Sequence, residues 1–287
     1  MSTSAIPTSD VITVEVHDHI ATVWLDRPEQ RNAFGPDFWV DLPPIMEALG
    51  VDPDVRVVVI AARGDAFTVG IDLKAFGPAF MAGGAALPDD DASEPTSDVA
   101  RRMALRTSIK TLQHTFSSIA DCPKPVIAAI HGYCIGAGLN LVTACDIRYA
   151  SGDVVFSSRE TKIAIVADVG TMQRLPRIID PGNVAELVYT GRDITADEAL
   201  TMGLVTHVSA DAEAVQAHAQ EIAAQIAANS PLAVQGSKAV LKATEDLSVE
   251  DGLDYVALWN SSFVTSNDLM EAISAFVQKR PPEFTGE

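Results

Sequence analysis

Two largely apolar runs, at residues 55–62 and 125–130, most constrain what this chain of 287 residues can fold into. From residue 57 the first reads VVVIAA, and from residue 126 the second reads VIAAI. Neither shows the apolar–polar alternation of a half-exposed strand. Strands that are covered on both faces read in this way, and they occur mainly in sheets with helices packed on either side. The two runs therefore predict an α/β fold.

The flanking patterns predict the other elements. A hairpin is expected at 11–16 and 21–25, helices at 36–49 and 99–120, and short strands at 147–150 and 154–156. From residue 171 onward we expect nearly everything to be helical or a helix connector, with long helices at 211–228, 231–243, 249–264 and 267–278. The chain is thus expected to divide into a strand-and-helix core with the catalytic site, residues 1–205, and a helical C-terminal region, residues 206–287.

One segment of the core, residues 77–98, lacks any periodicity and is rich in glycine, proline and aspartate. It reads as an exposed loop, either an idle insertion or a lid over a pocket.

Composition narrows the class of protein. The chain carries 20 basic and 39 acidic residues, a formal net charge of −19, and it is 47% hydrophobic. Such a charge repels nucleic acids and anionic lipid, so neither is an expected partner, and no apolar run is long enough to span a membrane. Three cysteines without a C-x-x-C spacing predict reduced thiols rather than zinc or disulfides. With no basic residue before Arg27, we expect no leader peptide and a cytoplasmic location.

Two glycine-containing segments follow the buried runs. Gly136 and Gly138 suggest a dinucleotide fold, but Leu141 stands where the third glycine of that motif belongs. Small residues at a helix start still leave backbone N–H groups free to bind an oxyanion. Tight packing alone is the alternative explanation. The segment around Gly70 offers a second turn of the same kind.

Two carboxylates bracket a mostly apolar stretch. Glu160 and Asp168 stand eight residues apart, and Asp168 lies between Ala167 and Val169. Burial in such surroundings would raise the pKa of Asp168 and let it hold or deliver a proton near neutrality. A capping or salt-bridged role is the alternative. None of the six histidines is assigned a catalytic role, and no spacing predicts a metal site.

A series of motifs resembles one known family, the crotonase (enoyl-CoA hydratase/isomerase) superfamily, along nearly the whole chain. The matching segments are LDRP at 25–28, AFTVGIDL at 66–73, KPVIAAIHG at 124–132, GAG at 136–138, ACDIR at 144–148, QRLP at 173–176, ADEA at 196–199 and AFVQKRP at 275–281. No single segment is decisive, but the ordered set is highly specific.

The resemblance implies a spiral of ββα units with a C-terminal helical region that mediates trimerisation, often into hexamers. It also implies a coenzyme A thioester as substrate, with no resident cofactor. By position, the backbone N–H groups of Ile71 and Ala137 would form an oxyanion hole. The residues matched to CoA contacts are Arg27, Val69, Phe276 and Lys279, the last two often acting across a subunit boundary; Arg31 and Lys74 are further candidate cations.

Position 140 separates the branches of this family. Hydratases resemble one another in having two glutamates 20 residues apart, which together activate a water. In this chain Glu160 matches the second, but Asn140 stands where the first would be. An amide cannot exchange a proton near neutral pH, so we expect hydration to be weak or absent. Segments 134–149 and 167–176 look most like the Δ3,5-Δ2,4-dienoyl-CoA isomerases, in which acids matching Glu160 and Asp168 move a proton along a conjugated chain. Those enzymes usually carry aspartate at the position of Asn140, which we expect to hydrogen-bond Glu160 or its water.

Other functions stay open at this point. Glu160 alone would suit an enoyl-CoA hydratase or a Δ3-Δ2-enoyl-CoA isomerase, and the same fold supports other thioester reactions such as hydrolysis or dehalogenation. A non-catalytic CoA-binding or RNA-binding homologue is a further alternative. The charge of −19 argues against RNA, and two acids in an apolar stretch argue against a scaffold. Fatty-acid β-oxidation is the expected pathway.

Overall fold

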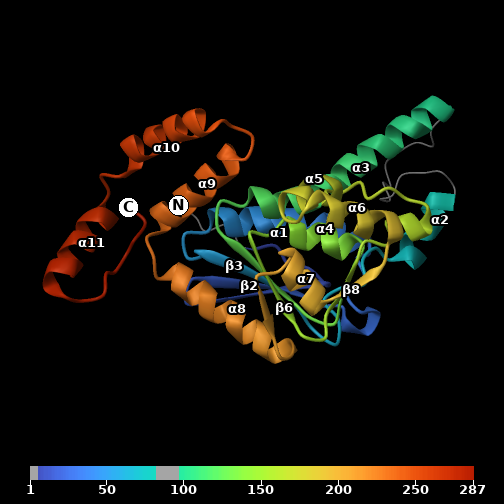
Figure 1. Ribbon diagram of the computed structural model, residues 1–287, viewed down its shortest axis with the longest axis horizontal. Helices are drawn as coiled ribbons and strands as arrows, with labels where there is room; N and C mark the ends of the chain where they lie inside the picture. Colours follow the sequence, from blue (N-terminus) through green and yellow to red (C-terminus); the bar gives the residue numbers. More distant parts are fainter. Residues whose placement is uncertain (1–5, 82–96) are drawn as a thin grey trace.

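The fold alternates strands and helices, as a computed structural model that describes residues 6–81 and 97–287 shows (Figure 1). The strands are β1 (Ile12–His17), β2 (Ile20–Leu25), β3 (Val57–Ala62), β4 (Val126–Ile130), β5 (Tyr133–Ile135), β6 (Ile147–Ser151), β7 (Val155–Ser157), β8 (Asp193–Thr195) and β9 (His207–Ser209). The α-helices are α1 (Pro36–Val51), α2 (Leu73–Met81), α3 (Asp98–Asp121), α4 (Ala137–Thr143), α5 (Thr171–Arg174), α6 (Pro181–Thr190), α7 (Ala196–Met202), α8 (Ala212–Ala227), α9 (Pro231–Thr244), α10 (Val249–Phe263) and α11 (Asn267–Gln278). Short 3-10 helices are η1 (Pro28–Gln30), η2 (Glu160–Ile163) and η3 (Leu175–Arg177).

The strands form two sheets, and from β4 to β7 successive strands alternate between them. The larger sheet has the order β1-β2-β3-β4-β6-β9, parallel except for the β1–β2 hairpin, and the smaller has the order β5-β7-β8. The chain passes from β4 in the large sheet to β5 in the small one and into α4, and then repeats the step from β6 to β7. This alternation is the ββα spiral that the sequence resemblance implied.

Helices cover both faces of the large sheet, which explains the two apolar runs. On one face, α8 presents a row of small side chains at a spacing of four residues, so the helix packs closely onto β3 and β4 (Val215, Ala219, Ala223 and Ala227). On the other face, α1 and α3 enclose an aromatic cluster in which Trp39 and Phe116 lie 5.1 Å apart between ring centroids. β3 and β4 are therefore buried along their whole length.

Several expectations change in detail. The region after residue 171 is not purely helical, because β8 and β9 add strands; with three residues each, they are too short to show a period in the sequence. Strand β9 and helix α8 both pack on the large sheet although they follow residue 206. Of the loop expected at 77–98, residues 82–96 lie outside the described residues. The three cysteines are free and buried.

Helices α9 to α11 project from one end of the sheet as an arm, and α2 lies at the opposite end of the molecule (Figure 1). Buried Asp268 ties the end of the chain to this arm, accepting hydrogen bonds from Ser230 Oγ at 2.6 Å and from the backbone of Thr285 at 2.8 Å. Burial alone would raise the pKa of Asp268, but the hydrogen bonds from Ser230, Thr285 and Gly286 outweigh it and lower the pKa. In the described part of the chain, no helix is both long and apolar enough to cross a bilayer.

Candidate active site

The two turns predicted to supply backbone donors lie against each other. Gly70 has φ +85°, and a Cβ there would sit 2.6 Å from Ile135 O and 3.2 Å from the Ala137 nitrogen. Only glycine permits both this conformation and this approach. Backbone hydrogen bonds between Thr68 and the β5 segment hold the contact: Thr68 N donates to Tyr133 O at 2.8 Å and Ile135 N donates to Thr68 O at 3.1 Å.

Within residues 6–81 and 97–287, the N–H groups of Ile71 and Ala137 have no protein acceptor. Neighbouring amides are used: Asp72 N donates to Phe34 O at 3.0 Å, and Gly136 N donates to Ser157 O at 2.8 Å. Ala137 is the first residue of α4, where N–H groups have no partner inside the helix. Two unpaired donors on adjacent turns suit a developing oxyanion.

Glu160 lies beside the second of these turns. A Cβ on Gly136 would sit 3.9 Å from Glu160 Oε1, and the positive φ of Gly136, +53°, leaves that position open. Both carboxylate oxygens accept hydrogen bonds: Oε1 from Asn140 Nδ2 at 3.1 Å and Oε2 from Ser158 Oγ at 3.0 Å. The carboxylate is therefore held in one orientation next to the oxyanion donors.

Asn140 links Glu160 to the segment that carries Asp168. It is fully buried, and its amide is used at both ends, because Oδ1 accepts a hydrogen bond from Thr171 N at 2.6 Å while Nδ2 donates to Glu160. The expected contact with Glu160 is thus present. Thr171 begins α5, three residues after Asp168, so one amide sets the spacing between both acidic segments.

Asp168 is half-buried between the buried side chains of Ala167 and Val169. Burial raises the pKa of its carboxyl, and a hydrogen bond from its own backbone only partly opposes the shift. Among the described residues, no other group donates to this carboxylate. Asp168 is therefore suited to hold a proton, whereas Glu160 accepts at both oxygens. Together, the two acids and the two N–H groups can move a proton on a substrate whose negative charge develops at an oxygen.

The residues matched to CoA contacts fall into two groups. Val69 immediately precedes Gly70. Arg27 contacts the end of the same turn, because its Nη1 donates to the Asp72 carboxylate at 3.2 Å, and it also donates to Ala33 O at 3.3 Å. Phe276 and Lys279 are instead exposed at the end of α11, on the projecting arm and away from that turn (Figure 1). The structure therefore does not bring the four together within one chain.

Sequence reasoning missed Ser158 and Thr171, which hold the site through a hydroxyl and a main-chain N–H. Ser158 stands two residues before Glu160, and this proximity is the one signal that could have suggested it. Thr171 carries no sequence signal, because a backbone donor looks the same in every residue type.

Replacing Asp168 by asparagine is expected to stabilise the protein near pH 7. The folded-state pKa lies above the unfolded value, so ionisation of Asp168 destabilises the fold above both values, and the penalty vanishes below the unfolded pKa. Thermal denaturation should show a melting temperature raised by roughly 1–4 °C at pH 7. The gain should shrink as the pH is lowered. Exposed Asp10→Asn is the matched control, and equal melting temperatures for Asp168→Asn and wild type would contradict the assignment.

Known proteins similar to this chain point to one reaction. It is 40% identical over 284 residues, covering 99% of both chains, to a peroxisomal Δ3,5-Δ2,4-dienoyl-CoA isomerase of Arabidopsis thaliana. It is 44% identical to a mitochondrial enzyme of the same name from Mus musculus, covering 91% of this chain and 77% of the mouse protein. The expected cytoplasmic location is contradicted, because these relatives are peroxisomal or mitochondrial. That prediction rested on the lack of a basic residue before Arg27 and on cysteines expected to be reduced, and neither feature identifies the compartment.

The fold and the family are also confirmed by comparison. The structure matches an enoyl-CoA hydratase from Bacillus anthracis with a TM-score of 0.84 and 30% identity, covering 97% of this chain and all of the other. The family model for enoyl-CoA hydratase/isomerase matches residues 15–287. Together with the two isomerases, these matches confirm the resemblance and the spiral fold that the sequence motifs predicted. The chain belongs to the enoyl-CoA hydratase/isomerase family.

Proposed function

We propose that this chain converts 3,5-dienoyl-CoA thioesters to 2,4-dienoyl-CoA thioesters, as an isomerase of fatty-acid β-oxidation. Relatives 40% and 44% identical carry the name of this activity. The observation that carries the proposal is the pairing of two unlike carboxyl groups. Glu160 accepts two side-chain hydrogen bonds, and Asp168 has a raised pKa and no donor from another described residue.

The reaction needs two proton-transfer groups because its two ends are far apart. Glu160, beside the oxyanion turns, removes a proton from C2 next to the thioester. The electron pair delocalises over the diene and the thioester oxygen, where the N–H groups of Ile71 and Ala137 stabilise the negative charge by several kcal/mol. Asp168 then gives its proton to C6. The double bonds move from C3 and C5 to C2 and C4, and both acids recover their starting states by exchange with solvent. CoA takes part only as the substrate's thioester group.

Asn140 disfavours the competing hydration reaction. Adding water across a double bond in this family uses a second carboxylate where Asn140 stands. Its amide is neutral and is already bonded at both ends, to Glu160 and to Thr171. It cannot take or give the second proton.

Parallel assays with a 3,5-dienoyl-CoA and with crotonyl-CoA test the proposal. Absorbance should rise as the first substrate becomes conjugated with the thioester, and crotonyl-CoA should be hydrated slowly or not at all. Glu160→Gln and Asp168→Asn should each lower kcat for the diene by about a hundredfold or more. Exposed Glu213→Gln and Asp10→Asn are the matched controls.

Rapid hydration of crotonyl-CoA with an inert diene would contradict the proposal and favour a hydratase. Conversion of the diene that survives Asp168→Asn would point to chemistry by Glu160 alone. If neither substrate reacts while CoA still binds, the isomerase assignment fails in favour of another thioester reaction.

Asn140→Asp is expected to move the acidic limb of the isomerisation pH profile upward by about one pH unit or more. A carboxylate at this position could still accept from Thr171 N, but it would place an oxygen where Nδ2 now lies, 3.1 Å from Glu160 Oε1. Two carboxylates this close resist joint ionisation. The activity itself should survive, since related isomerases usually carry aspartate here. An unchanged pH profile would contradict the role given to Asn140.

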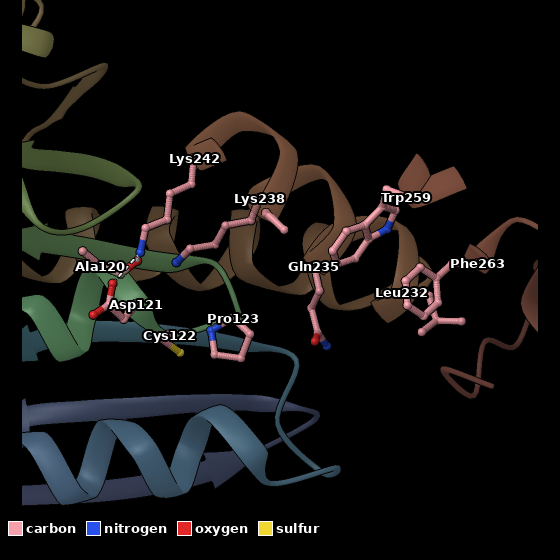
Figure 2. A pocket seen from close by; sticks show the side chains of 11 residues that line it. Ala120, Asp121, Cys122, Pro123, Leu232, Gln235, Lys238, Lys242, Trp259 and Phe263 are labelled. Carbon is pink, nitrogen blue, oxygen red and sulfur yellow. Dashed lines mark hydrogen bonds and ion pairs between the residues drawn. The ribbon is translucent and has the colours of Figure 1, made fainter. Parts of the chain in front are cut away.

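We further propose that the arm docks on a second copy of the chain, within a trimer or a hexamer. Its two last helices expose apolar side chains that a solvated surface rarely gathers in such number: Leu253, Leu258, Phe263, Met270, Ile273, Phe276 and Val277. A cavity of about 400 Å³ opens between α9, α10 and the end of α3, lined by Trp259, Phe263 and Leu232 (Figure 2). Docking would also carry Phe276 and Lys279 toward a partner's CoA site.

The molar mass in solution tests this assembly. Light scattering should give about three or six times the chain mass of 30.4 kDa. The double variant Met270→Asp, Ile273→Asp should dissociate the assembly, because a buried unpaired charge is costly. Tyr189→Asp, at an exposed position on α6, should leave the mass unchanged. A monomer at micromolar concentration would overturn the proposal.

A further inference from the structure

The segment that carries Asp168 has no regular structure of its own. Residues 164–170 run between η2 and α5 without a helix or strand, so contacts from elsewhere must fix them. The backbone carbonyl of Asp168 accepts a hydrogen bond of 2.6 Å from Gln113 Nε2. Gln113 is a half-buried residue of α3 that precedes Asp168 by 55 positions in the chain. It takes no part in the contacts of Glu160 and Asn140 described above.

The same face of α3 holds the end of this segment. Ser117 lies one turn after Gln113, and its hydroxyl accepts a hydrogen bond from Arg174 Nη2 at 3.2 Å. The guanidinium lies over Gly170, where a Cβ would come within 1.9 Å of Arg174 Nη1. Residues four apart face the same way on a helix, so α3 presents two side chains that together hold the segment at Asp168 and, beyond it, at Arg174.

The Gln113 amide is itself oriented. Its Oε1 accepts a hydrogen bond from Lys110 Nζ at 2.9 Å, which leaves the NH₂ group pointing at the Asp168 carbonyl. Glu160 has a separate set of contacts, from Asn140 and Ser158, and none from α3. Asn140 links the two acidic segments, but the α3 hydrogen bond reaches only the one that carries Asp168.

We infer that Gln113 is a positioning residue for Asp168 and not for Glu160. This inference rests on the proposed isomerisation, in which Glu160 acts at C2 and Asp168 at C6. Loss of the Gln113 hydrogen bond frees the Asp168 backbone to move while Glu160 and the oxyanion donors stay in place. Proton removal at C2 should then continue while delivery at C6 slows, a separation that general loss of structure would not produce.

The test compares exchange and conversion in D₂O. Gln113→Met fills similar space without a donor, and Gln113→Ala removes both volume and donor. For each we expect conversion of the 3,5-diene to fall about tenfold to a hundredfold. Deuterium exchange into C2 of recovered substrate should stay within about twofold of wild type. His114→Ala, at the next and exposed position of α3, should change neither rate.

Two results would overturn the inference: a parallel fall of C2 exchange and conversion in Gln113→Met, or wild-type conversion in both Gln113 variants. A wild-type protein that converts no diene would refute the proposed isomerisation first and this role of Gln113 with it. Circular dichroism melts of the Gln113 variants distinguish loss of fold from loss of position, because a folded variant with separated rates is the expected outcome.

Discussion

The buried amide of Asn140 is the interaction on which the candidate site depends. Its two ends bond different segments, Glu160 through Nδ2 and Thr171 through Oδ1, and a fully buried amide must satisfy both. Asn140 lies one turn after Ala137 in α4, so a helix of seven residues supplies both an oxyanion donor and the link between the acids. A small shift of α4 would therefore displace the Ala137 donor and disturb the hydrogen bonds to Glu160 and Thr171 together.

The site combines groups that oppose the stability of the fold. Gly70 and Gly136 have positive φ values that bring two turns close enough to offer adjacent N–H groups, and glycine gives up the most chain entropy on folding. Asp168 keeps a carboxyl partly out of water without a partner from another described residue, which raises its pKa. Features that cost folding stability but supply reactive groups are typical of functional sites.

The sequence predicted the buried strands and the raised pKa of Asp168, because both depend on local patterns. The apolar runs at 57–62 and 126–130 became β3 and β4, and the placement of Asp168 among apolar neighbours anticipated its raised pKa. The sequence alone could not predict the hydrogen bond from Gln113 to the Asp168 carbonyl, because 55 residues separate the two and no pattern marks a backbone acceptor. Strand β8 was also missed, and the location of Phe276 on the arm depends on how the last helices pack.

The division of labour between Glu160 and Asp168 can be measured by following hydrogen itself. A 3,5-dienoyl-CoA labelled with deuterium at C2 is converted in ordinary water, and the product is analysed for the label at C6. If Glu160 takes the C2 hydrogen and Asp168 delivers another from its own carboxyl, C6 receives hydrogen from the medium and no deuterium. Deuterium carried from C2 to C6 would show that one carboxylate serves both ends, which would contradict a two-acid site.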